Sequence, residues 1–367
     1  MMAGHIGDGR RLCRERPAPY RPNPRFLLGI DVQAYFRGEG AKVSKRSAIS
    51  IVGMACIGAV LAAWSLFATH AVAAEGTTGK TSLAVQSGDD ACSITWNGKT
   101  LMRYRKAVGV PKAYVAELAP PSGRNILRDS PEDHKHHHGL MFAVGIDGVD
   151  YWAEAADSGR QVEAGDFLAS AATENEIATV TLAHALNWVT PEGKRQLVER
   201  RRLRFRNSSQ LPQAVLLLWR SELSPAAGAE SVELWGREYF GLGIRFLAAM
   251  DGGNDFRNAA GGRGVEGTNN APAEWCAYTT DLDGRPVTVV LYDLPGNPRA
   301  PAKWFTMTQG FTYISATLGL KEAPLTVTAE QPPLTLQYGV AVFDAAATDA
   351  EIQTAYQELK ALAKENP

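Results

Sequence analysis

The chain has 367 residues, of which 45% are hydrophobic, and its formal net charge at pH 7 is −1. This length and composition predict a globular protein with a large core. A nucleic-acid-binding protein would carry a strong basic excess, so we expect no nucleic-acid partner.

The N-terminal 74 residues contain two segments of different character. Residues 1–44 are rich in Arg, Pro and Gly without apolar periodicity, which predicts a disordered extension. The alternative is that the start codon is misassigned and translation begins near Val43. Residues 45–74 begin with Lys45 and Arg46, continue as the apolar stretch Ile49–Phe67 and end in small residues, a pattern typical of a signal peptide. The stretch is also long enough to be an uncleaved membrane anchor. Both interpretations predict a periplasmic or secreted body, with membrane contact only through this segment.

From about residue 80 the chain shows short alternating runs separated by turn residues, which predicts one all-β domain over residues 80–367. Asn97-Gly98 and Asp147-Gly148 predict two tight hairpins, because both dipeptides suit turns with positive φ angles. The first joins strands at 93–96 and 99–104, and the second follows an apolar run at 140–146. Further strands are predicted at 161–170, 177–189, 197–207, 213–221, 231–236, 239–248, 274–280, 286–293, 303–308, 311–319 and 334–343.

The C-terminus is the one part of the body that predicts a helix. Thr348 and Glu351 have capping-box spacing, and apolar residues recur at helical spacing up to Leu362. We expect this helix to pack as a lid on the sheet edge. The glycine-rich stretch Asp251–Asn270 is predicted to be a long loop that could cover a site.

Two cysteines, Cys92 and Cys276, belong to the body of the chain. An oxidising compartment would permit a disulfide between them. Two free buried thiols are the alternative.

Four of the seven histidines lie within the five residues from His134 to His138. Imidazole exchanges protons near neutral pH and is the commonest metal ligand in proteins. If the segment is extended, His134, His136 and His138 project to one side and could bind a divalent metal, while His137 projects to the other. A hydrogen-bonded structural knot and an exposed basic patch are the alternatives. No other cofactor is indicated.

His184 shares a predicted strand face with apolar residues, so we expect it to face inward and stay neutral. It is either a core residue or a second acid/base group. Asp293 ends a predicted strand and precedes Asn297 and Arg299, a set that could grip substrate oxygen atoms or simply form a turn.

The order of several motifs resembles that of the bacterial proteins labelled PmoA-like or "methane oxygenase PmoA", over about residues 90–360. The likeness lies in Ser130–Ala143, Gly148–Trp152, Tyr239–Phe246 and Asn297–Arg299, with Trp304 and a final strand that ends at Tyr338. Methane oxygenase activity is not expected, because the body has no second apolar span of ~20 residues.

This resemblance implies a relation to galactose-mutarotase-like proteins, and therefore a large antiparallel β-supersandwich with a C-terminal α-helix. Members of that group bind or transform carbohydrates in a concave sheet with two histidines and a carboxylate. Carried over, the resemblance implies His137, His184 and Asp293 as catalytic residues. The substrate-binding residues would be His134, His138, Trp152, Tyr239, Arg245, Asn297 and Arg299.

The predicted function is therefore that of an exported protein that binds a sugar, a sugar derivative or an oligosaccharide, with His/Asp acid–base chemistry of the epimerase, lyase or hydrolase type. The alternative is a non-catalytic glycan-binding or metal-binding protein. The catalytic interpretation requires the histidine cluster, His184 and Asp293 to meet in one cavity.

Overall fold

The computed structural model describes residues 83–365, apart from residues 176 and 254. The predicted extension at 1–44 and the predicted signal peptide or anchor at 45–74 lie outside the described residues. Among the residues described, no helix is both long enough and apolar enough to cross a membrane.

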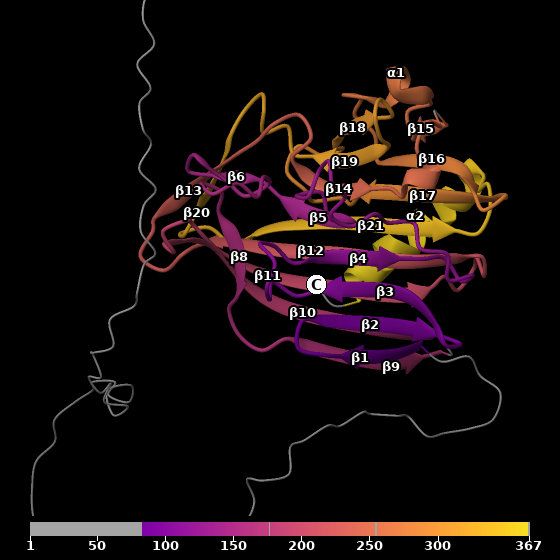
Figure 1. Cartoon of the computed structure of the whole chain (residues 1–367), viewed down its shortest axis with the longest axis horizontal. Coiled ribbons are helices and arrows are strands. Elements are labelled where there is room, and N and C mark those ends of the chain that lie inside the picture. Colours follow the sequence, from indigo (N-terminus) through magenta and orange to yellow (C-terminus); the bar gives the residue numbers. More distant parts are fainter. Residues whose placement is uncertain (1–82, 176, 254, 366–367) are drawn as a thin grey trace, which may run out of the picture. The chain divides into compact units, whose positions relative to one another are not determined.

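The described residues form mainly antiparallel β-sheets, which confirms the all-β prediction. An eight-stranded sheet contains, in spatial order, β1 (Leu83–Ser87), β2 (Ala91–Trp96), β3 (Lys99–Arg105), β4 (Tyr114–Leu118), β5 (Leu140–Ala143), β14 (Gly241–Arg245), β19 (Tyr313–Thr317) and β18 (Lys303–Met307). Figure 1 shows this sheet in front of a second, larger one.

The second sheet has nine strands, eight of which lie side by side in one hydrogen-bonded order. Its order is β15 (Phe256–Asn258), β16 (Trp275–Leu282), β17 (Arg285–Asp293), β21 (Leu334–Phe343), β12 (Ala214–Pro225), β11 (Arg195–Asn207), β10 (Ile177–Val189) and β8 (Arg160–Glu163), with β9 (Leu168–Glu174) paired to β10. A small third sheet contains β20 (Leu325–Thr328), β13 (Ser231–Trp235), β6 (Gly145–Ile146) and β7 (Val149–Asp150).

The main hydrophobic core lies between the two large sheets. Strand side chains alternate between the two faces, so every second residue of β10 points into this core, as Val180, Leu182 and Leu186 do. His184 points the same way and is buried, as the sequence predicts. The eight-stranded sheet contributes Phe142 and Ile314 from its inner face.

The predicted C-terminal helix is present as α2 (Asp349–Lys364), and its capping box of Thr348 and Glu351 is formed. It packs on the outer face of the nine-stranded sheet and not on its edge. Ile352 and Leu359 of the helix bury against strand residues of β12, β16, β17 and β21. The helix covers a face because β12 and β21 present apolar side chains on both sides, and the outer ones must be covered.

Several short elements differ from the prediction. The stretch expected as one strand at 161–170 is divided between β8 and β9, and the glycine-rich loop contains the short helix α1 (Gly264–Thr268) and β15. A 3-10 turn covers Ala248–Met250. Strands β1, β4, β15 and β20, which have three to five residues each, were not predicted.

Cys92 lies on β2 and Cys276 on β16, and both thiols are buried and free. The two strands belong to different sheets. The described structure therefore matches the alternative of two free thiols and not the disulfide.

Candidate functional site

A pocket with a volume of about 510 Å³ lies on the outer face of the eight-stranded sheet. Tyr313 on β19 points into it, while Ile314, the next residue along the strand, points into the main core. Eight of the eleven lining residues carry a ring. The lining comprises His134, His136, His137, Trp152, Glu238, Tyr239, Phe305, Met307, Gln309, Phe311 and Tyr313.

Two aromatic rings, one that lines the pocket and one that packs behind it, lie directly over glycines. The ring of Tyr313 lies over Gly243 of β14, where a Cβ atom would come within 1.9 Å of the tyrosine hydroxyl. Trp235 similarly lies over Gly145, where a Cβ atom would come within 2.1 Å of the indole. Glycine at these two positions lets the rings lie against the sheet.

The histidine cluster lies in a loop, residues 128–139, that folds back on itself. The amide of Ser130 donates to the carbonyl of His137 (2.9 Å), and the amide of His137 donates to the carbonyl of His134 (2.9 Å). The base of the loop is joined to β14, because the amide of Arg245 donates to the carbonyl of Gly139 (2.8 Å). These bonds hold the loop in one conformation.

Within this loop His134, His136 and His137 gather at the pocket. The ring centroid of His137 lies 4.7 Å from that of His134 and 4.5 Å from that of His136. The predicted separation of His137 from the other two is wrong, because the segment forms consecutive turns and not an extended strand. The turns bring these three rings to one side of the loop.

His138 is directed away from these three rings and does not line the pocket. Its Nδ1 lies 2.7 Å from Asp129 Oδ1 and its Nε2 lies 2.8 Å from Glu154 Oε1. Its ring also stacks on Tyr114 at 4.2 Å. Both ring nitrogens are therefore occupied, so the structure does not support His138 as a substrate-binding residue.

The same geometry does not support the metal site predicted from His134, His136 and His138. His138 is bound to two carboxylates on the far side of the loop. In the described part of the chain, no group of three or more His, Cys, Asp or Glu side chains is arranged to hold a metal ion.

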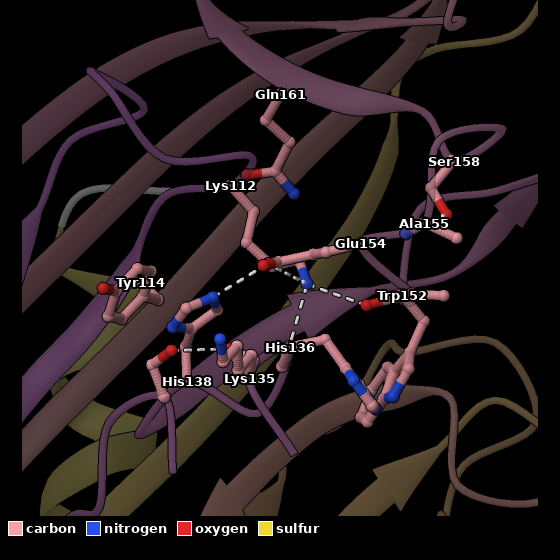
Figure 2. A network of polar contacts seen from close by, with 12 residues as sticks. Lys112, Tyr114, Lys135, His136, His138, Trp152, Glu154, Ala155, Ser158 and Gln161 are labelled. Atoms are coloured by element: carbon pink, nitrogen blue, oxygen red, sulfur yellow. Dashed lines mark hydrogen bonds and ion pairs between the residues drawn. The ribbon is translucent and has the colours of Figure 1, made fainter. Parts of the chain in front are cut away.

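Lys112 connects the two loops that build the pocket, as Figure 2 shows. Its ammonium group lies 2.9 Å from Glu154 Oε1 and donates to the carbonyls of Trp152 (2.7 Å) and His136 (3.4 Å). The side chain is only 2% exposed. Sequence reasoning missed Lys112 and Glu154, because neither lies in a periodic pattern and their contact spans 42 residues of sequence.

Glu154 lies at the centre of this network. Burial disfavours the charged form of all three groups, and it lowers the pKa of Lys112 despite the neighbouring Glu154. Burial alone would raise the pKa of Glu154, but the hydrogen bond from His138 and the charge of Lys112 lower it to about 2. Burial lowers the pKa of His138, but its hydrogen bonds to Asp129 and Glu154 outweigh that effect and raise it above the ordinary value. An ionised Glu154 between two cationic partners is thus favoured, and the network is a structural support for the pocket.

His137 is the most deeply buried histidine in the pocket wall, at 7% exposure. Its Nδ1 has no hydrogen-bond partner among the residues that the structure describes. Burial, followed by the neighbouring His136 and His134, lowers its pKa to about 3. At neutral pH His137 is therefore an uncharged imidazole that can accept a hydrogen bond.

The other predicted substrate-binding residues divide into two groups. Trp152 and Tyr239 line the pocket, and their rings meet at 5.3 Å. Arg245 is 1% exposed and lies behind the wall, with its guanidinium 3.8 Å from the ring centre of Phe311. It supports Phe311 and does not line the pocket.

His184 is not part of the pocket lining. It belongs to the nine-stranded sheet, where its Nδ1 lies 2.9 Å from the hydroxyl of Tyr104 and its Nε2 lies 3.4 Å from Glu163 Oε1. Burial and the charge of Arg201 lower its pKa to about 3. It is therefore a core residue with polar partners, which was one of the two predicted alternatives.

Asp293, Asn297 and Arg299 also lie outside the pocket lining. Asp293 accepts hydrogen bonds from Asn297 Nδ2 (2.6 Å) and from the amide of Ala302 (2.8 Å). Arg299 donates to four backbone carbonyls, those of Leu318, Gly319, Ala323 and Pro324. The three side chains close a loop, as the turn-forming alternative predicted, and the convergence of His137, His184 and Asp293 does not occur.

The low pKa values of His137 and His184 predict a loss of stability in acid. Between pH 6.5, their ordinary pKa, and about pH 3, the unfolded chain binds a proton at each histidine and the folded chain does not. The free energy of unfolding should therefore fall by about 1.4 kcal/mol per pH unit for each histidine as the pH decreases. Urea unfolding at pH 4, 5 and 6 should show a shallower dependence in His137→Gln than in the wild type. An equal pH dependence of the free energy of unfolding in both proteins would contradict the lowered pKa of His137.

Comparison with known proteins gives one family match. The family described as "Family of unknown function (DUF6807)" matches residues 91–357. No curated protein matches the chain.

Three solved structures are similar to the chain at low identity. A protein described as a kojibiose phosphorylase from the human microbiome has 9% identity and a TM-score of 0.28, covering 72% of this chain and 32% of that one. A heparinase III gene product has 10% identity and a TM-score of 0.30, and the match covers 74% of this chain and 36% of that one. A GH36 alpha-galactosidase from Geobacillus stearothermophilus has 11% identity and a TM-score of 0.33, and the match covers 77% of this chain and 42% of that one. The chain spans less than half the length of each, and likenesses at these TM-scores carry no functional argument.

Proposed function

Because the chain belongs to the DUF6807 family, whose description assigns no activity, we propose a function from the pocket itself: it binds a sugar ring and carries out acid–base chemistry on it. The observation that carries this proposal is the lining, in which flat rings surround a few polar groups. Aromatic rings offer apolar faces to the C–H groups of a sugar, while imidazole and carboxylate groups bind its hydroxyls. The volume of about 510 Å³ lies within the usual range of small-molecule sites.

Two groups are suited to the chemistry. His137 is a neutral imidazole that can accept a hydroxyl proton, and Glu238 is a carboxylate in the same pocket. The backbone hydrogen bond of Glu238 lowers its pKa, so this carboxylate is ionised at neutral pH. Glu238 takes the role that the sequence assigned to Asp293. Epimerase, lyase and hydrolase reactions all involve proton transfer to or from the substrate by positioned side chains.

Replacement of His137 tests the catalytic part of the proposal. On a sugar that the wild type converts, His137→Gln should reduce turnover by about 10²–10⁴-fold, because a positioned proton acceptor contributes that much. His184→Gln is the matched control, since it replaces an equally buried imidazole outside the pocket. Thermal melting checks that both variants are folded. Unchanged turnover in His137→Gln would remove this residue from the mechanism.

A non-catalytic glycan-binding protein is the second candidate. The observation that favours it is the low basicity of His137, whose pKa of about 3 makes it a weak proton acceptor in the free protein. In that case a sugar panel would reveal binding without conversion, and His137→Gln would weaken binding alone.

Export to the periplasm or beyond, and a relation to PmoA-like and galactose-mutarotase-like proteins, remain parts of this proposal. The support for export is the leader pattern at residues 45–74. The support for the relation is the order of motifs from Ser130 to Tyr338. Fractionation of cells that produce the full chain would test the location.

A further inference from the structure

A second hollow, with a volume of about 260 Å³, adjoins the pocket. Glu238 and Phe305 line both cavities. Because the cavities share these two residues, a ligand with consecutive units can place one unit in the pocket and the next in the hollow.

The wall of the hollow comes partly from the glycine-rich stretch that the sequence predicts as a loop over a site. Asn269 and Asn270, which follow α1, line it. The amide of Asn270 donates to the carbonyl of Trp304 (2.7 Å), and Asn269 Oδ1 accepts from the amide of Thr306 (3.2 Å). These bonds attach the end of the loop to β18, so the hollow has a defined wall.

The charges of the hollow differ from those of the pocket. Three cationic side chains and two carboxylates line the hollow, so cations outnumber carboxylates by one. They are Arg237, Lys303 and Lys321, with Glu238 and Glu322. The carboxylate of Glu238 lies 3.3 Å from the ammonium of Lys321. Cations that outnumber carboxylates favour an anionic group, and Arg binds carboxylate or sulfate oxygens in a bidentate manner.

We propose that the site takes an oligosaccharide of at least two units, and that the unit in the second hollow carries an anionic group, a carboxylate or a sulfate. This inference rests on the proposed function, since the first unit is the sugar that the pocket holds. It adds a chain-length requirement and a charge requirement that the pocket alone does not impose.

Binding measurements with matched sugars test this inference. The probes are monosaccharides and disaccharides of the gluco, galacto and manno series, each in neutral, uronic acid and sulfate ester form. The best acidic disaccharide should bind at least tenfold more tightly than both its monosaccharide and its neutral counterpart. The uronic acid and sulfate arms identify which anion is preferred.

A charge reversal locates the effect. Lys303→Glu should remove most of the tenfold gain and leave monosaccharide affinity unchanged, because Lys303 lines the hollow and not the pocket. Lys194→Glu is the matched control, at an exposed position in the turn between β10 and β11.

Three outcomes would overturn the inference. They are equal affinity for monosaccharides and disaccharides, equal affinity for neutral and acidic disaccharides, and an acidic-disaccharide gain that survives Lys303→Glu. The proposed function survives all three. If no sugar of the panel binds, the proposed function fails and the inference fails with it.

Discussion

Arg201→Met is expected to lower the free energy of unfolding by about 3–5 kcal/mol, the usual cost of removing one partner of a buried ion pair. Arg201 and Glu199 are both fully buried on β11, with Nε and Oε1 2.8 Å apart. The carboxylate of Glu199 also accepts from Trp188 and Ser221. Without the guanidinium, a buried carboxylate loses its cation.

The effect should reach the pocket as well. Arg201 Nη1 donates to the carbonyl of Ala113 (2.7 Å), the residue between Lys112 and β4. The ion pair of the nine-stranded sheet therefore holds the start of a strand in the opposite sheet. We expect the variant to bind sugar more weakly in addition to its lower stability.

Arg200→Met is the control for Arg201→Met. Arg200 is the adjacent residue on the same strand, but it is exposed. Its replacement should change the free energy of unfolding by less than about 0.5 kcal/mol, as is usual for surface positions. Urea denaturation of both variants gives the comparison. A loss below about 1 kcal/mol for Arg201→Met would contradict the role of the ion pair.

The second large effect is expected for Lys112→Met. Methionine keeps much of the apolar length of lysine but loses the contact with Glu154 and the hydrogen bonds to the carbonyls of Trp152 and His136. We expect a loss of about 3 kcal/mol in stability, since Glu154 and two carbonyls lose their buried partner. Because Lys112 joins both loops of the pocket, sugar affinity should fall at least tenfold.

Lys135→Met provides the comparison for Lys112→Met. Lys135 lies in the same histidine-rich loop but is exposed. Thermal melting and titration calorimetry with a bound sugar should show little change for this variant. If Lys112→Met bound sugar as tightly as the wild type, the two loops would not depend on Lys112 for their positions.

The features that could be predicted from the sequence are those set by local patterns. Alternation over β10 placed His184 inward, and Thr348 with Glu351 marked the start of α2. Trp152 and Tyr239 were assigned to the site by the resemblance, and both line the pocket. Each of these depends on residue type and short spacing.

The features that were missed depend on contacts that only the folded loops create. The consecutive turns of residues 131–136 separate His138 from its neighbours, and its contacts with Asp129 and Glu154 decide where the ring points. Asp293 is a carboxylate at the end of a strand, where it could line a site. Its two oxygens instead accept hydrogen bonds from Asn297 and from the amide of Ala302. Sequence spacing contains no information about such partners.

The lining of the pocket by Glu238, Phe305 and Phe311 was missed for a related reason. These residues come from the segment before β14, from β18 and from the β18–β19 turn, which meet only after the eight-stranded sheet has formed. An aromatic residue in a strand is equally suited to a core or to a binding surface. The order of the strands decides between the two.

The central claim is that the pocket around His134, His136 and His137 binds a sugar. The most direct measurement is the NMR spectrum of the histidine ring nitrogens, recorded while the tightest sugar of the panel is added. We expect the signals of these three rings to shift to saturation together, while the signal of His184 stays unchanged because it lies outside the pocket. A sugar-dependent shift of His184 with no change in the three pocket histidines would contradict the account.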